Sequence, residues 1–137
     1  MKNEVNMQQR KDITNRKDIE LLVNVFYERV NKDKLLSPIF NEVIQDRWPQ
    51  HLEKMYRFWE TVLLDKRSYT GSPFLPHASL PVNHTHFETW LHLWYTTVDE
   101  LFEGEKTEEA KWRAGKMATM FHSKIEYFRN STEKPLR

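Results

Sequence analysis

One histidine stands in an unusually stiff segment of the chain. The stretch GSPFLPHASLP, residues 71–81, surrounds His77 with one glycine and three prolines. Because Pro73, Pro76 and Pro81 restrict the backbone on both sides, fixing the imidazole ring costs less conformational entropy than in an ordinary loop. A held imidazole suits metal ligation, but a loop histidine can equally bond to a nearby carbonyl group. From the residues alone both interpretations stay open.

The other histidines do not form a familiar metal motif. None of them has the HExxH spacing of a helical zinc site. His84 and His86 stand two residues apart near an expected helix start, a spacing that seldom directs both rings to one metal. We therefore expect four of these side chains to lie on solvated or half-buried faces: His84, His86, His92 and His122.

Three further polar rings border apolar helix faces. His51 lies beside the core stripe of its helix, and its position within the first turn after Pro49 leaves open whether it faces a cavity or solvent. Tyr27 and Trp90 sit at the edges of two other stripes and bring an O–H and an N–H donor. These donors could converge on one buried cavity. A haem would explain the set. It needs one neutral imidazole as the iron ligand, a broad apolar and aromatic slot, and few polar groups on the side opposite that imidazole. An aromatic-rich core is the plain alternative.

Helical periodicity dominates the segments that carry these residues. Apolar residues recur every three or four positions over residues 18–32 and 48–66, after Asn83, and after Thr107. We expect Asp46, Asn83 and Thr107 to cap or open three of these helices. A short helical piece is expected within LLSPIFNEVIQD, broken at Ser37-Pro38. No segment alternates as a strand would, so the predicted fold class is all-α.

The composition excludes several functional classes. With 21 basic and 20 acidic residues the net charge is +1, which gives no reason to expect nucleic acid as a partner. The absence of cysteine excludes disulfides, iron–sulfur ligation and thiol catalysis. We find no transmembrane segment or targeting signal, so a soluble cytoplasmic protein with no membrane partner is expected. We expect one domain over residues 15–130, a polar extension over 1–14 and a tail over 131–137.

Four segments together carry a resemblance to a known family. They are VFYERVNKDKLLSPIFN, RWPQHLEKMYRFWETVLL, YTGSPFLPHASLP and FETWLHLW, in this order along residues 18–128. The chain resembles the group III truncated haemoglobins, a bacterial truncated globin family. The resemblance implies a two-over-two helical sandwich around haem b.

The resemblance also implies a role for each matching residue. His77 matches the metal ligand, on the proximal side of the haem, and the distal ligand-binding positions are Tyr27, His51 and Trp90. The residues implied to contact the cofactor are Phe40, Met55, Phe58, Trp59, His77 and Trp90. No catalytic residue is assigned.

Three functional hypotheses follow. The first is a haemoglobin that binds dioxygen, nitric oxide or carbon monoxide at a five-coordinate iron, with Tyr27 and Trp90 stabilising the ligand. The second is a haem enzyme with peroxidase-like or nitric oxide dioxygenase activity, supported by a reductase. The third is a haem-free helical interaction module. We expect a monomer in each of the haem cases.

Overall fold

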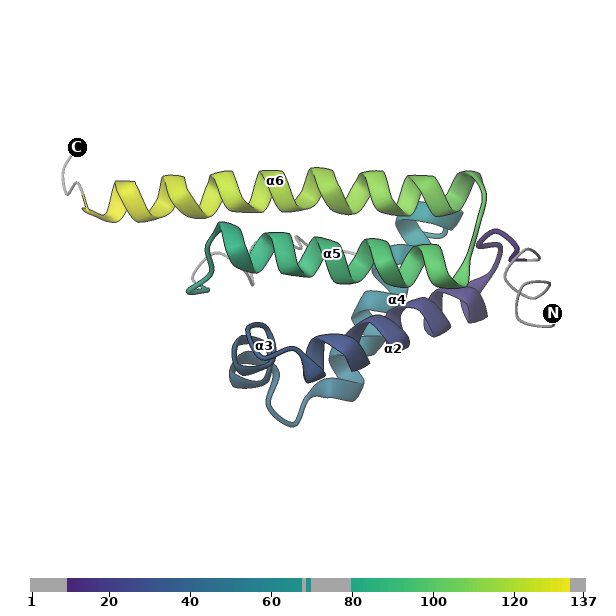
Figure 1. Cartoon of the computed structure of the whole chain (residues 1–137), viewed down its shortest axis with the longest axis horizontal. Helices are drawn as coiled ribbons and strands as arrows, with labels where there is room; N and C mark the ends of the chain where they lie inside the picture. Colours follow the sequence, from purple (N-terminus) through teal and green to yellow (C-terminus); the bar gives the residue numbers. More distant parts are fainter. Residues whose placement is uncertain (1–9, 68, 70–79, 134–137) are drawn as a thin grey trace.

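The regular secondary structure in the described part of the chain consists of helices alone (Figure 1). The computed structural model describes residues 10–67, 69 and 80–133. Within these ranges the helices are α2 (Arg16–Lys32), α3 (Ser37–Ile44), α4 (Trp48–Leu64), α5 (His84–Leu101) and α6 (Glu105–Glu133). The predicted all-α class is confirmed. None of these helices combines the length and apolarity needed to span a lipid bilayer.

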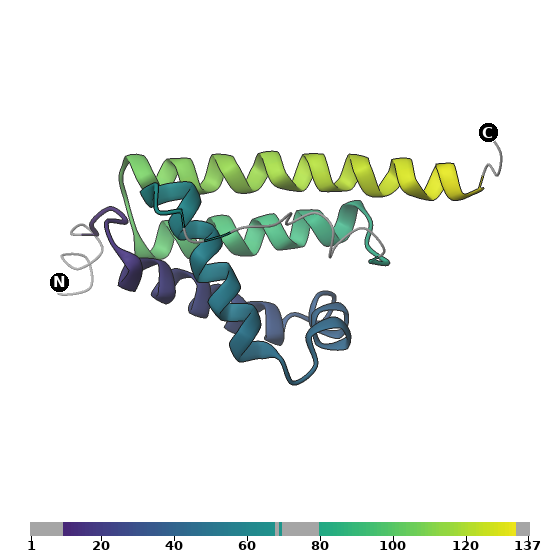
Figure 2. The ribbon, with the colours of Figure 1, turned by 180° about the vertical axis from the view of Figure 1, so that it is seen from behind.

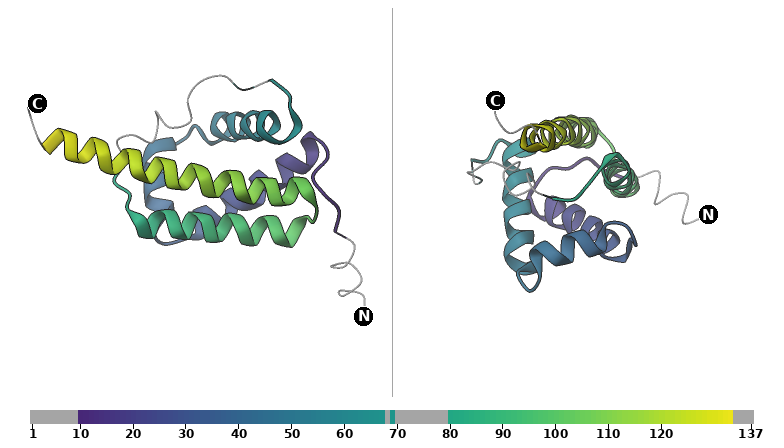
Figure 3. Two further views of the ribbon diagram at one scale, coloured as in Figure 1. Left: turned by 90° about the horizontal axis from the view of Figure 1, so that it is seen from above. Right: turned by 90° about the vertical axis from the view of Figure 1, so that its left-hand side faces the viewer.

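Two pairs of helices cross each other. Helices α5 and α6 run antiparallel side by side, and α2 and α4 cross this pair obliquely (Figures 1 and 2). In the view from the end, the short α3 lies on the side of α2 that is away from α6 (Figure 3, right). Side chains from all five helices line one cavity, and the candidate site is found there.

The core follows the predicted stripe of α2. Its five apolar residues are at most 1% exposed: Ile19, Leu22, Val23, Phe26 and Val30. Burying an aliphatic or aromatic side chain of this size stabilises the fold by about 1.5–3 kcal/mol. Trp59 of α4 and Trp94 of α5 stack against each other with ring centroids 4.6 Å apart, so aromatic packing joins the two helix pairs.

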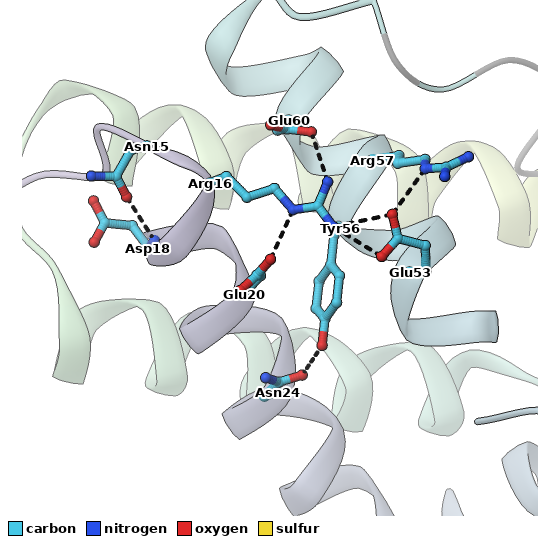
Figure 4. Close-up of polar contacts among 9 residues, drawn as sticks. All are labelled: Asn15, Arg16, Asp18, Glu20, Asn24, Glu53, Tyr56, Arg57 and Glu60. Atoms are coloured by element: carbon cyan, nitrogen blue, oxygen red, sulfur yellow. Dashed lines mark hydrogen bonds and ion pairs between the residues drawn. The ribbon is translucent and has the colours of Figure 1, made fainter. Parts of the chain in front are cut away.

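A polar cluster on the opposite face of α4 fixes this helix against α2. The Arg16 guanidinium donates to both carboxylate oxygens of Glu53, at 2.9 and 3.1 Å, and to Glu20 at 2.9 Å (Figure 4). Its third contact reaches Glu60 at 3.4 Å, and Tyr56 donates to Asn24 beside it. Because these contacts lie away from the apolar face of α4, they leave that face free to line a cavity.

Two of the three predicted helix starts are wrong. Arg47, not Asp46, precedes α4, and no side chain caps that helix. Helix α6 begins at Glu105, two residues before Thr107. The predicted N-cap of α5 is confirmed, because the Asn83 side chain accepts from the backbone N–H of Thr85 at 3.0 Å.

The start of α6 is capped from a distant segment. The Asp12 carboxylate accepts from the backbone N–H groups of Lys106 at 2.9 Å and Thr107 at 2.8 Å, and from the Thr107 hydroxyl at 2.8 Å. Ile13 beside it is 1% exposed and belongs to the core. Residues 12 and 13 therefore take part in the packed fold although the sequence assigns them to an extension, and α6 continues past residue 130. The domain boundaries themselves remain predictions.

Candidate functional site

A cavity of about 340 Å³ lies between the helices, and its wall is mostly apolar and aromatic. Every predicted site residue within the described ranges lines it: Tyr27 from α2, Phe40 from α3, His51, Met55, Phe58 and Trp59 from α4, and Trp90 from α5. The fold thus brings together side chains from four helices. His77, the predicted metal ligand, lies outside the described residues.

Tyr27 forms the polar corner of this cavity. Its side chain is 8% exposed, and burial raises the pKa of its phenol, so the hydroxyl stays protonated and can donate. Within the described part of the chain the hydroxyl forms no hydrogen bond. A buried donor left without a partner costs about 1–3 kcal/mol, which a ligand in the cavity would recover.

His51 packs directly on Tyr27. The two ring centroids are 5.0 Å apart and the ring planes meet at 82°. The imidazole lines the cavity and its Nε2 atom is buried, so the ring faces inward. The orientation that the sequence left open is therefore decided by the packing of α4 against α2.

Trp90 contributes the second donor. Its ring packs edge-on against Phe26, with centroids 5.8 Å apart, and parallel to Trp94 at 6.5 Å. The Trp94 indole N–H donates to the carbonyl oxygen of Ala110 at 3.1 Å, whereas the Trp90 N–H has no hydrogen bond to any described residue. Because an indole donates and never accepts, Trp90 offers the cavity a donor only.

Sequence reasoning missed two residues at this site. Trp48, predicted as a core residue, packs against both Tyr27 and His51, with centroids at 5.7 and 5.6 Å. His86, predicted on a solvated or half-buried face, is half-buried and also lines the cavity. The neighbouring residues in the sequence do not indicate that Trp48 or His86 lies at the site, although Trp48 stands one turn before His51.

Comparison with known proteins identifies the fold. A family model described as bacterial-like globin matches residues 11–125. The chain is 34% identical over 115 residues to the group 3 truncated haemoglobin of Campylobacter jejuni, covering 81% of this chain and 91% of that protein. The chain belongs to the group III truncated haemoglobins. The crystal structure of the group III truncated haemoglobin from Campylobacter jejuni matches this one with a TM-score of 0.78 and 32% identity, covering 85% of this chain and 95% of the other.

This truncated haemoglobin is therefore a haem-binding globin, and the cavity fits that cofactor. The wall offers flat aromatic surfaces and few polar atoms, as a porphyrin requires. Two exposed cations, Arg47 and Lys54, also line the cavity, where they would complement the negative charge of haem carboxylates.

Within the described residues the histidines that line the cavity are His51 and His86. His86 takes part in the capping box of α5, where its Nδ1 accepts the backbone N–H of Asn83 at 3.1 Å. The same Nδ1 atom lies 3.0 Å from the Asn83 side-chain oxygen, so both contacts of the capping box engage this nitrogen of the ring. Among the described residues no group of three or more potential ligands could hold a metal ion.

Proposed function

We propose that this globin holds haem b in the cavity through His77 and binds dioxygen, nitric oxide or carbon monoxide on the Tyr27 side, at an iron that is otherwise five-coordinate. The observation that carries the proposal is the pair of donors, Tyr27 and Trp90, which face one apolar cavity and form no hydrogen bond within the described part of the chain.

The haem iron supplies reversible binding of a diatomic molecule, onto which it shifts electron density. The Tyr27 hydroxyl and the Trp90 indole N–H donate to that molecule, and His51 closes the same corner. A hydrogen bond to a charged acceptor contributes about 1–3 kcal/mol, which corresponds to a roughly 5- to 150-fold slower release of the ligand.

The remaining predicted residues hold the flat face of the cofactor. Phe40, Met55, Phe58 and Trp59 line the cavity beside Trp90, and none of their side chains carries a charge. Their packing excludes water, which strengthens each hydrogen bond donated within the cavity.

Replacement of the donors and the ligand tests this function. Tyr27→Phe should retain haem and release carbon monoxide or dioxygen at a changed rate, with a roughly 5- to 150-fold acceleration of dioxygen release. His77→Ala should lose stable haem, whereas His92→Ala, the matched control at an exposed histidine, should retain it. Optical spectra of the purified histidine variants show whether each retains haem. Full haem retention and unchanged spectra in His77→Ala would exclude His77 as the ligand.

A second function is favoured by the contact between His51 and Tyr27. His51 lines the same cavity as Tyr27, with ring centroids 5.0 Å apart, and histidine is the side chain that most often transfers protons in enzymes. This arrangement suits peroxidase-like or nitric oxide dioxygenase activity. Rapid turnover of hydrogen peroxide or nitric oxide with a reductant, lost in His51→Leu, would support the enzyme over the carrier. A reductase partner and a monomeric state remain predictions.

A further inference from the structure

Trp48 holds the two distal rings in contact. Its ring lies edge-on to both Tyr27 and His51, while those two rings also contact each other, so the three form a closed aromatic triangle. Each ring in such a triangle limits the rotation of the other two. The orientation of His51 over Tyr27 therefore depends on where Trp48 is held.

Asn41 of α3 fixes the position of Trp48. The Trp48 indole N–H donates to the side-chain oxygen of Asn41 at 2.9 Å. The Asn41 amide nitrogen donates in turn to the side-chain oxygen of Asn31 at 2.9 Å and to the carbonyl of Ser37 at 3.0 Å. Because an indole only donates, it must face the amide oxygen, and the orientation of Asn41 is thereby defined. The relay ties the start of α4 to α3 and to the end of α2.

The turn between α3 and α4 needs such a restraint. Gln45 has φ 56° and ψ −120°, a conformation that usually requires glycine, and the Arg47 backbone N–H closes the turn on the Ile44 carbonyl at 2.9 Å. Such a backbone conformation costs about 1–3 kcal/mol, and it persists only where surrounding contacts enforce it. The bond from Trp48 to Asn41 spans the turn, since the two residues flank it on either side.

We propose that Asn41 and Trp48 act as a latch whose closure positions His51 against Tyr27 and so sets the rate at which the distal pocket releases its ligand. The proposal rests on the proposed function, because it assigns to these positioning residues an effect on the ligand that Tyr27 binds. Without the hydrogen bond the indole can rotate away from the triangle, and His51 loses one of the walls that keep it over Tyr27.

Two single variants and their combination test the latch. Trp48→Phe keeps an aromatic ring but removes the donor, and Asn41→Leu removes the acceptor at similar volume. Each should accelerate release of carbon monoxide or dioxygen roughly threefold to tenfold. The double variant should be no faster than the faster single variant, because both changes remove the same bond. Glu42→Ala, an exposed exchange in α3 next to Asn41, is the matched control and should release at the wild-type rate.

A direct readout separates positioning from general destabilisation. Nuclear Overhauser effects between ring protons of His51 and Tyr27, recorded under carbon monoxide, should weaken in both single variants and remain in Glu42→Ala. Wild-type release rates with unchanged ring contacts would overturn the latch, as would additive effects in the double variant. If Tyr27→Phe leaves release unchanged while the latch variants still alter the ring contacts, the proposed function fails and the positioning role stands.

Discussion

The cap that Asp12 places on α6 yields a stability prediction that the structure makes quantitative. The carboxylate accepts four hydrogen bonds, from the backbone N–H groups of Ile13, Lys106 and Thr107 and from the Thr107 hydroxyl. Thr107 is 1% exposed, so water cannot replace the lost acceptor there. Asp12→Ala therefore removes an N-cap and leaves polar groups of Thr107 buried without their acceptor.

The expected loss of stability in Asp12→Ala is large for a single substitution. Loss of an N-cap costs about 0.5–2 kcal/mol, and a buried donor left unsatisfied costs about 1–3 kcal/mol. Because these contributions overlap, we expect Asp12→Ala to lower the free energy of unfolding by about 2–4 kcal/mol. With a urea dependence of about 2 kcal/mol per molar, the midpoint of unfolding should fall by about 1–2 M.

The assay is urea unfolding followed by far-ultraviolet circular dichroism, with every variant at the same haem loading. Asp46→Ala is the matched control, because Asp46 is exposed and no side chain caps α4. It should change the free energy of unfolding by no more than about 0.5 kcal/mol. If Asp12→Ala were as stable as this control, the cap across the two segments would contribute nothing and the reasoning would be refuted.

The destabilisation caused by Asp12→Ala should also depend on pH. Burial alone would raise the pKa of Asp12, but the hydrogen bonds from Lys106, Thr107 and Ile13 outweigh it, so the pKa is lowered in the folded protein. A carboxyl with a depressed folded pKa stabilises the protein above its unfolded pKa, and this contribution is lost as the pH falls through the folded value. The difference between wild type and Asp12→Ala should therefore be full at pH 7 and shrink below about pH 4.

Two further exchanges probe the backbone and the polar cluster. Gly104→Ala puts a methyl group on a backbone with φ 143° and within 2.4 Å of Asp12, so it should destabilise the protein by about 1–3 kcal/mol, measured by the same urea assay. Gly115→Ala, in the middle of α6, should cost far less, because its nearest neighbour is the end of a flexible tyrosine side chain and alanine favours the helix by up to about 1 kcal/mol. Arg16→Gln should lower stability by about 1 kcal/mol at low salt and by less in 1 M NaCl, since its partially exposed ion pairs are screened. A loss in Arg16→Gln that does not change with salt would indicate packing instead of charge.

Local patterns in the sequence determined most of the secondary structure. The apolar residues of α2, from Ile19 to Val30, recur with the helical period, and the period alone tells which face is buried. Asn83 is a good N-cap because its side chain reaches backbone N–H groups two and three residues ahead. Such signals act within one or two turns, so they can be recognised without knowing the fold.

Tertiary structure decided the features that join distant segments. Asp12 caps a helix more than ninety residues further along the chain, which is why Thr107 was mistaken for its start. The contact of Trp48 with both Tyr27 and His51 likewise depends on how α2, α3 and α4 cross, and no single helix records that geometry. The position of a residue in the sequence determines the direction of its side chain around its own helix. The distance between two side chains on different helices follows from how the helices pack, and these distances give the cavity its shape.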